Sequence, residues 1–323
     1  MRRNRAVFWP GKVRGYGQCR LNLGVNSTGA STELGPQFGG NEVTVVKRIS
    51  IFAKGNVDVH DSLHSCRIGG ELQWNGINDS LKPAFPDVKV RLRHETLTRF
   101  DALLAADGQI PAAFADHSEL ELGTYPLAGQ FSDKVFTTPS DAVILSILPD
   151  VASTLVRHKQ DGFLFYPPPE SENWPEAERA WLRENFEKVG LVDVETSMEN
   201  LAAVVERVQA ERDVPVLVYN MSPIIPGDMV HCHLGLNDIY STRVKRFNLA
   251  LIELSQAIGI SIVDIDALVA RGGADRMKVD AMHLTPAGYE AASNEVVRIL
   301  SDLGTLDADP VEAKAENRVR ISA

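Results

Sequence analysis

Asp280 and His283 stand three residues apart near the carboxyl-terminal end of the sequence. A carboxylate at this spacing on a tight turn can accept the Nδ1–H of the imidazole, which fixes the tautomer and leaves Nε2 free to take a proton from a nucleophile. The plainer alternative is an aspartate that caps a loop beside a histidine that only packs. The pair is therefore a candidate acid and base whose meaning depends on the elements around it.

Those elements favour the catalytic interpretation. An apolar strand pattern over residues 260–266 precedes the pair, and an amphipathic segment to about Leu303 follows it. Thr285 can act as the N-cap of that helix, and Pro286 is tolerated in its first turn because an N–H there would have no partner. The pair is thus predicted in the loop after the last strand of a parallel sheet, at the edge where open α/β sheets carry their chemistry.

Strand and helix patterns alternate along most of the chain. Strands are predicted over residues 43–53, 88–92, 142–148, 214–220 and 260–266, and helices over residues 96–105, 175–189, 198–211, 241–258 and the segment to about 303. Residues 163–169 fit either a short extra strand or an apolar loop. This alternation predicts an α/β fold with a doubly wound parallel sheet, a three-layer α/β/α sandwich.

Composition sets the domain plan and the classes of partner. We expect a flexible arm over residues 1–41, one α/β domain over 42–304 with an insertion near 107–140, and a flexible tail over 305–323. The net charge of −10 argues against nucleic acid as a partner. No apolar run is long enough for a membrane span, and no secretory signal is evident, so the expected location is the cytoplasm. The three scattered cysteines favour reduced thiols.

The carboxyl-terminal quarter of the chain resembles the last block of the SGNH/GDSL hydrolase family, through the helix and strand of residues 247–265 and the segment Asp280-Ala281-Met282-His283-Leu284-Thr285-Pro286-Ala287-Gly288-Tyr289. The resemblance implies an SGNH-hydrolase or flavodoxin-like fold, with Asp280 as catalytic acid and His283 as base. It also implies a nucleophile in a Gly-Asp-Ser-Leu motif after the first strand. The segment His60-Asp61-Ser62-Leu63 differs from that motif in its first residue only, which makes Ser62 the candidate nucleophile. The alternative is that Ser62 only caps a helix.

The other blocks of that family are not matched. Ser62 stands several residues later than the family spacing places a nucleophile, and residues 93–96 hold no glycine for the second block. Where the third block has Gly-x-Asn-Asp, this sequence has Leu148-Pro149-Asp150; the later Gly235-Leu236-Asn237-Asp238 matches by letter but comes too late in the topology. The residues predicted to serve as oxyanion donors or substrate contacts are Asn56, which is favoured for its place after the first strand, Gly55, Asn75 and Asp150.

A metal site is the next alternative. Asp58, His60, Asp61 and His64 lie close in sequence, and His60 and His64 would share one face of a helix. His231-Cys232-His233 forms a second cluster. Neither cluster matches a metalloenzyme motif, and no glycine-rich dinucleotide motif or P-loop is present, so no metal and no cofactor are predicted.

The sequence as a whole predicts an esterase that acts on an acyl ester of a small molecule or carbohydrate. Ser62 would attack the carbonyl, His283 would act as base and then acid, and Asp280 would orient His283. Two alternatives stay open: an acyltransferase in carbohydrate or specialised-metabolite assembly, and an SGNH-like binding protein without catalysis, which the unmatched oxyanion blocks favour. The oligomeric state is open.

Overall fold

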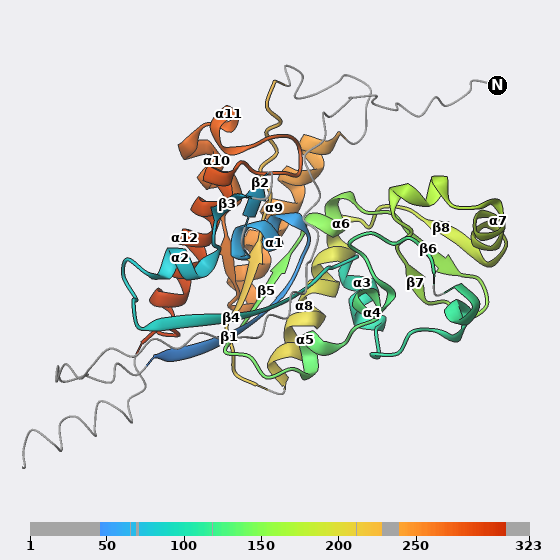
Figure 1. Cartoon of the computed structure of the whole chain (residues 1–323), viewed down its shortest axis with the longest axis horizontal. Coiled ribbons are helices and arrows are strands. Elements are labelled where there is room, and N and C mark those ends of the chain that lie inside the picture. Colours follow the sequence, from blue (N-terminus) through green and yellow to red (C-terminus); the bar gives the residue numbers. More distant parts are fainter. Residues whose placement is uncertain are drawn as a thin grey trace, which may run out of the picture.

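The computed structural model describes residues 46–64, 66–68, 71–117, 119–210, 212–227 and 239–307. Five strands of this part form one sheet in which every neighbouring pair is parallel (Figure 1). In chain order they are β1 (Lys47–Lys54), β4 (Val88–Glu95), β5 (Ala142–Ser146), β9 (Val216–Tyr219) and β10 (Ser261–Val263).

The spatial order of the strands is β10-β9-β5-β1-β4. The chain therefore runs outward from β1 to β4, then crosses to the other side of β1 and continues outward through β5, β9 and β10. The strand order of a doubly wound, flavodoxin-like sheet reverses in this way. Such sheets bind ligands at the reversal, in the crevice outside the carboxyl ends of the two strands that meet there. Here those two strands are β1 and β5, and the predicted fold class is confirmed.

One face of the sheet is covered by helices from both ends of the chain. Apolar residues of these helices form one core with Ile49 and Ile51 of β1 and Val90 of β4. The covering helices are α1 (Val57–Leu63), α2 (Ile77–Leu81), α10 (Ile265–Gly272), α11 (Ala274–Met277) and α12 (Pro286–Asp302). A two-stranded sheet of β2 (Cys66–Ile68) and β3 (Glu71–Trp74) joins α1 to α2.

The opposite face is covered by the middle of the chain. Its core contains Phe52 of β1, Val143 and Leu145 of β5 and Val218 of β9, because successive strand residues point to opposite faces. The covering helices are α3 (Phe100–Ala105), α5 (Lys134–Thr137), α6 (Leu148–Ala152), α8 (Val194–Ala210) and α9 (Tyr240–Ile258). Together the two covered faces give the three-layer sandwich that the sequence predicts.

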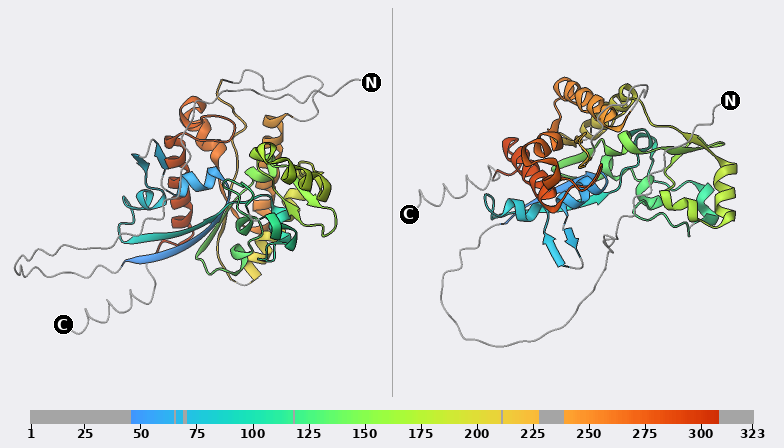
Figure 2. Two further views of the ribbon diagram at one scale, coloured as in Figure 1. Left: turned by 45° about the vertical axis from the view of Figure 1, so that its right-hand side comes forward. Right: turned by 90° about the horizontal axis from the view of Figure 1, so that it is seen from above.

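The strands β6, β7 and β8 and helix α7 lie beside the sandwich (Figures 1 and 2), and this part of the chain has a separate aromatic core. It is built around the short antiparallel sheet β7-β6-β8 and around residues from the predicted insertion. Its elements are η1 (Ala112–His117), α4 (Leu127–Gln130), β6 (Leu155–His158), β7 (Leu164–Phe165), η2 (Pro169–Asn173), α7 (Glu176–Asn185) and β8 (Phe186–Val189). We name this part the aromatic lobe; its buried residues are Phe114, Leu122, Phe131, Val156, Phe165, Trp174 and Phe186.

Several boundaries differ from the predictions, and the differences at two elements matter most. The helix predicted over residues 175–189 ends at Asn185, because the next four residues pair with β6 as β8. The strand predicted over residues 260–266 ends at Val263, where the Asp264 side chain accepts a hydrogen bond from the Ala267 N–H and caps α10. The loop predicted directly after that strand is therefore preceded by two helices, α10 and α11.

Several predictions fall on other parts of the chain. The arm of residues 1–41, most of the tail of residues 305–323, the His231-Cys232-His233 cluster and the segment Gly235–Asp238 lie outside the described residues. Within the described residues, no helix is both long and apolar enough to cross a membrane.

Candidate active site

The loop between α11 and α12 holds Asp280 and His283. Lys278 and Leu284 form an isolated antiparallel bridge at its base, and the Val279 N–H donates to the His283 carbonyl at 2.9 Å. Thr285 caps α12 as predicted: its hydroxyl oxygen accepts from the Gly288 N–H at 3.2 Å, and Pro286 follows it. The loop is therefore closed at both ends by backbone hydrogen bonds.

Within the loop, Asp280 and His283 form the predicted pair. The His283 Nδ1 lies 2.8 Å from Oδ2 and 3.0 Å from Oδ1 of Asp280, and Oδ1 also accepts from the backbone N–H groups of Met282 and His283, each at 2.8 Å. Nδ1 must carry the proton in a bond to a carboxylate, so the lone pair of the neutral ring is on Nε2. Nε2 has no hydrogen-bond partner among the described residues, and the ring is about half exposed. The arrangement leaves a base open to solvent.

The electrostatics of the loop keep Asp280 ionised. Partial burial acts to raise the pKa of Asp280, but the hydrogen bonds from the His283 and Met282 backbones and from the imidazole outweigh burial, and the pKa lies below its ordinary value. A carboxylate beside Nδ1 stabilises the imidazolium that forms when Nε2 takes a proton. Asp280 is thus suited both to orient His283 and to stabilise its charged form.

A buried lysine and a partly buried tyrosine support the same loop. The Lys278 ammonium donates to the carbonyls of Ser222, at 2.9 Å, and Ala281, at 3.2 Å, and the Tyr240 hydroxyl donates to the Ala281 carbonyl at 3.2 Å. Burial lowers the pKa of Lys278 to about 8, although the nearby Asp280 and Asp266 oppose the shift. These contacts tie the loop to the segment after β9 and to α9. Neither Lys278 nor Tyr240 is among the site residues predicted from the sequence.

Ser62, the predicted nucleophile, lies inside α1 and is fully buried. Its hydroxyl donates to the Asp58 carbonyl at 2.7 Å, and the Tyr219 hydroxyl, 2.9 Å away, must then be the donor in the bond between the two side chains. No hydrogen bond joins Ser62 to His283 in the described part of the chain. The structure therefore does not assemble the predicted triad, and Ser62 in this conformation is closed to a substrate.

A buried carboxylate, that of Asp58, lies between β1 and β5, where the strand order of the sheet reverses. Asp58, at the start of α1, accepts a hydrogen bond from the Ser146 hydroxyl at the end of β5 and another from the Asn56 N–H at 3.2 Å. Burial raises the pKa of Asp58 above its ordinary value, against these hydrogen bonds. Asp58 therefore links the carboxyl ends of β1 and β5 across the crevice position.

Gly55 and Asn56 follow β1 directly, as predicted. A Cβ on Gly55 would lie 2.5 Å from Cγ2 of Val59, so only glycine fits beneath α1. The Asn56 side chain bonds to the backbone of Leu97 and, in the amide orientation that satisfies both of its ends, to the Tyr125 hydroxyl at 3.1 Å. Both residues lie at the carboxyl edge, and their role as oxyanion donors stays a prediction.

Asp150 and Asn75 are placed elsewhere. Asp150 is fully buried on α6, where its two oxygens accept from the Phe100 N–H at 2.9 Å and the Ser197 hydroxyl at 2.7 Å. A direct contact between Asp150 and a substrate is incompatible with that burial, which corrects the prediction; the carboxyl joins α3 to α8 instead. Asn75 is exposed after β3, and its backbone N–H caps onto the Asp79 side chain at 3.2 Å.

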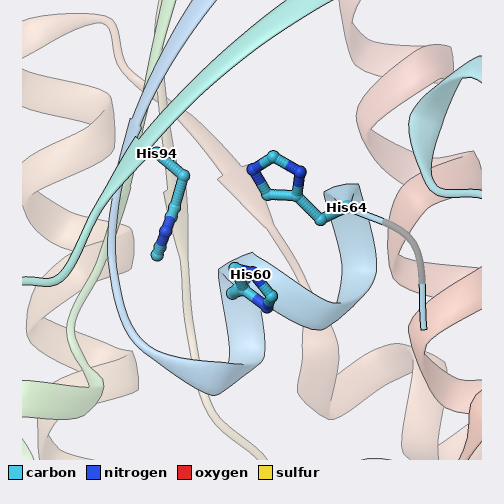
Figure 3. Close-up of side chains that lie close together, drawn as sticks. All are labelled: His60, His64 and His94. Atoms are coloured by element: carbon cyan, nitrogen blue, oxygen red, sulfur yellow. The ribbon is translucent and has the colours of Figure 1, made fainter. Parts of the chain in front are cut away.

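Three histidines come together near the first strands (Figure 3). One ring nitrogen of each of His60, His64 and His94 lies within 4.8 Å of the others, an arrangement that could hold a metal ion. Sequence spacing groups His60 with His64 but not with His94, which reaches them because the sheet register sets it opposite Ala53 of β1. Burial, followed by repulsion from neighbouring groups, lowers the pKa of His64 to about 4 and that of His94 to about 3.

The fold and the loop define an α/β protein with a doubly wound parallel sheet and an Asp–His pair at its carboxyl edge. Neither a protein-family model nor a curated protein matches the sequence. Similar solved structures include an acetyl xylan esterase (10% identity, 78% of this chain and 100% of the other, TM-score 0.43), an acetyl-xylooligosaccharide esterase variant from Geobacillus (10%, 83% and 98%, TM-score 0.44) and a member of the lipolytic G-D-S-L family from Veillonella parvula (11%, 79% and 99%, TM-score 0.41). These identities and TM-scores describe a distant similarity of backbone fold.

Proposed function

We propose that this protein hydrolyses an acyl ester of a small molecule or carbohydrate, with His283 as the general base. The observation that carries the proposal is the bond between Asp280 and His283 Nδ1 at 2.8 Å, on a loop closed by backbone bonds. It leaves the lone pair of the neutral ring on Nε2, which has no hydrogen-bond partner in the described part of the chain. General bases positioned in this way contribute about 10²- to 10⁴-fold to a rate. The resemblance of this segment to the SGNH/GDSL block supports ester chemistry over other uses of the pair.

In this proposal the attacking group is a water molecule at Nε2 of His283. His283 removes a proton from the water as its oxygen bonds to the ester carbonyl carbon. The imidazolium, stabilised by Asp280, then gives that proton to the leaving alkoxide as the carbon–oxygen bond breaks. A water nucleophile is preferred because Ser62 is buried and its own proton is engaged by the Asp58 carbonyl.

Hydrolysis of p-nitrophenyl acetate by purified protein tests the pair. His283→Ala is expected to lower the rate by about 100-fold or more, because the general base is lost. Asp280→Asn is expected to lower it by about tenfold or more, because His283 then adopts the wrong tautomer or becomes a poorer base. Asp161→Asn is the matched control: Asp161 lies 3.1 Å from Nδ1 of His158, also three residues away, but on the aromatic lobe. A His283→Ala variant as active as the wild type would refute the proposal.

The acyl-enzyme route through Ser62 is tested separately with a fluorophosphonate probe. Intact-mass analysis should show no adduct that depends on Ser62, because α1 would have to open before the hydroxyl could react. An adduct lost in both Ser62→Ala and His283→Ala would instead establish the serine mechanism. In Ser62→Ala the Tyr219 hydroxyl loses a hydrogen-bond acceptor. The fold of this variant is therefore checked by circular dichroism, and its spectrum must match that of the wild type.

The buried Ser62 also favours a second candidate function, a binding protein of this fold without catalysis. The loop of Asp280 and His283 would contact a ligand, with these two side chains as polar contacts. This candidate predicts neither ester hydrolysis above the His283→Ala background nor a probe adduct. The two measurements above therefore decide between the candidates.

A further inference from the structure

The cluster of His60, His64 and His94 has the composition and support of a metal site. His60 lies on α1, and His64 is the residue that ends this helix, where its N–H donates to the His60 carbonyl at 2.8 Å. The three rings lie close together (Figure 3). The ring centroid of His60 lies 4.9 Å from that of His64 and 5.1 Å from that of His94. The site is thus assembled from two elements, α1 and the end of β4, that the core holds against each other.

Hydrogen bonds fix the proton position in two of the rings. The His60 Nδ1 lies 2.7 Å from Oδ1 of Asp61, so Nδ1 carries the proton and Nε2 keeps its lone pair. The His94 Nε2 lies 3.0 Å from the Gly55 carbonyl, which can only accept, so the lone pair of His94 is on Nδ1. Histidines that ligate metals almost always donate their other N–H to a carboxylate or a backbone carbonyl. Both kinds of partner are present here.

We propose that His60, His64 and His94 bind one divalent transition-metal ion, with zinc as the best fit. Three imidazoles with no cysteine among them suit zinc, cobalt or nickel, and a set of three protein ligands leaves a fourth position for water or a ligand. Zinc–nitrogen bonds of about 2.0–2.1 Å set tetrahedral ligand atoms about 3.3 Å apart. One nitrogen of each ring now lies within 4.8 Å of the others. Rotation of the His60 and His64 side chains, which are not buried, would bring the nitrogens to the shorter separation that zinc requires.

This inference does not depend on the ester hydrolysis proposed above. The mechanism given for His283 uses no metal, and the histidine cluster is described by its own contacts. The two proposals can therefore fail separately, and the metal test below is read from binding and spectra, not from activity.

The experiment uses the full-length protein, stripped with a chelator and titrated with Co²⁺ and then with Zn²⁺. Co²⁺ should give the visible absorption of a four-coordinate ion at one equivalent, and Zn²⁺ should displace it and raise the melting temperature. His60→Ala and His64→Ala should each abolish the spectrum or weaken binding by 100-fold or more. Asp61→Asn, which keeps all three ligands, should weaken binding by about 10- to 100-fold because the supporting carboxylate is lost.

Two controls make the result specific. His117→Gln replaces a histidine that stacks on Trp181 in the aromatic lobe and should bind metal as the wild type does. A His231→Ala, Cys232→Ser, His233→Ala variant removes the second cluster of potential ligands named in the sequence and should also keep the one-equivalent site. Circular dichroism establishes that each variant is folded. Binding that survives in His60→Ala and His64→Ala, or that is lost in the 231–233 variant, would overturn the proposal.

Discussion

Replacing Asp150 with asparagine should remove a pH dependence from the stability of the whole fold. Asp150 is fully buried, and burial raises its pKa to about 7, although hydrogen bonds from Ser197 and Phe100 oppose the shift. The folded protein therefore binds a proton at this carboxyl between about pH 4 and pH 7 that the unfolded chain releases. Stability must fall as pH rises through that window, because the folded state there holds more protons than the unfolded state.

The size of the effect follows from the two pKa values. The difference between about 7 and the ordinary 3.8 corresponds to about 4 kcal/mol, at about 1.4 kcal/mol for each pH unit, as an upper limit. Asparagine is isosteric: its oxygen can still accept from the Phe100 N–H, and its amide can donate to the Ser197 hydroxyl. Asp150→Asn should thus match the wild type within about 1 kcal/mol at pH 4.5 and exceed it by up to about 4 kcal/mol at pH 8.

The assay is urea unfolding followed by far-ultraviolet circular dichroism at pH 4.5 and pH 8. The difference between variant and wild type cancels the other groups that titrate. Asp193→Asn is the control of opposite kind, because Asp193 is exposed and hydrogen bonds from Thr196 lower its pKa. If the difference between Asp150→Asn and the wild type were the same at both pH values, the assignment of a raised pKa to buried Asp150 would be refuted.

Two further predictions concern the loop of Asp280 and His283. Gly288→Ala would place a Cβ 2.4 Å from the Met277 carbonyl oxygen, so we expect a loss of about 2 kcal/mol or more in urea unfolding, together with a lower rate of ester hydrolysis; Gly190→Ala, where a Cβ meets nothing within 4 Å, is the control. Burial lowers the pKa of Lys278 to about 8, so between pH 8 and about 10.5 the unfolded chain holds the extra proton and stability should rise with pH. Urea unfolding of Lys278→Met over that range should show a smaller rise, and an identical slope would contradict the assignment.

The sequence predicted those features that depend on local chemistry. The five strands of the sheet, the Thr285 cap and the Asp280–His283 bond all follow from residues near one another in the chain, and all are present. The strand β8 could not be foreseen, because Phe186–Val189 extends a helical pattern and pairs with β6 only through the tertiary fold. Long-range pairing there overrides local preference.

The candidate site shows the same division. Ser62 matched a short motif, but its environment is set by Tyr219, which is 157 residues away and closes over the hydroxyl. His94 stood in the sequence as a departure from a family block, and only the register of β4 on β1 brings it to His60 and His64. Asp150 follows the central strand closely in the sequence, as predicted. The turn into α6, however, directs its side chain into the core.

The aromatic lobe has a consequence for how unfolding is observed. Two of the four tryptophans, Trp174 and Trp181, belong to its core or pack against it. Among the described residues, the two cores on the faces of the central sheet contain no tryptophan. A third tryptophan, Trp74 of β3, donates its indole N–H to the Ser62 carbonyl of α1 at 3.2 Å. Indole emission will therefore report on the lobe and on this one contact, whereas the circular dichroism signal is dominated by the helices of the sandwich. If the lobe opens at lower urea than the sandwich, the two optical signals will give different midpoints, and their separation measures how independently the lobe folds.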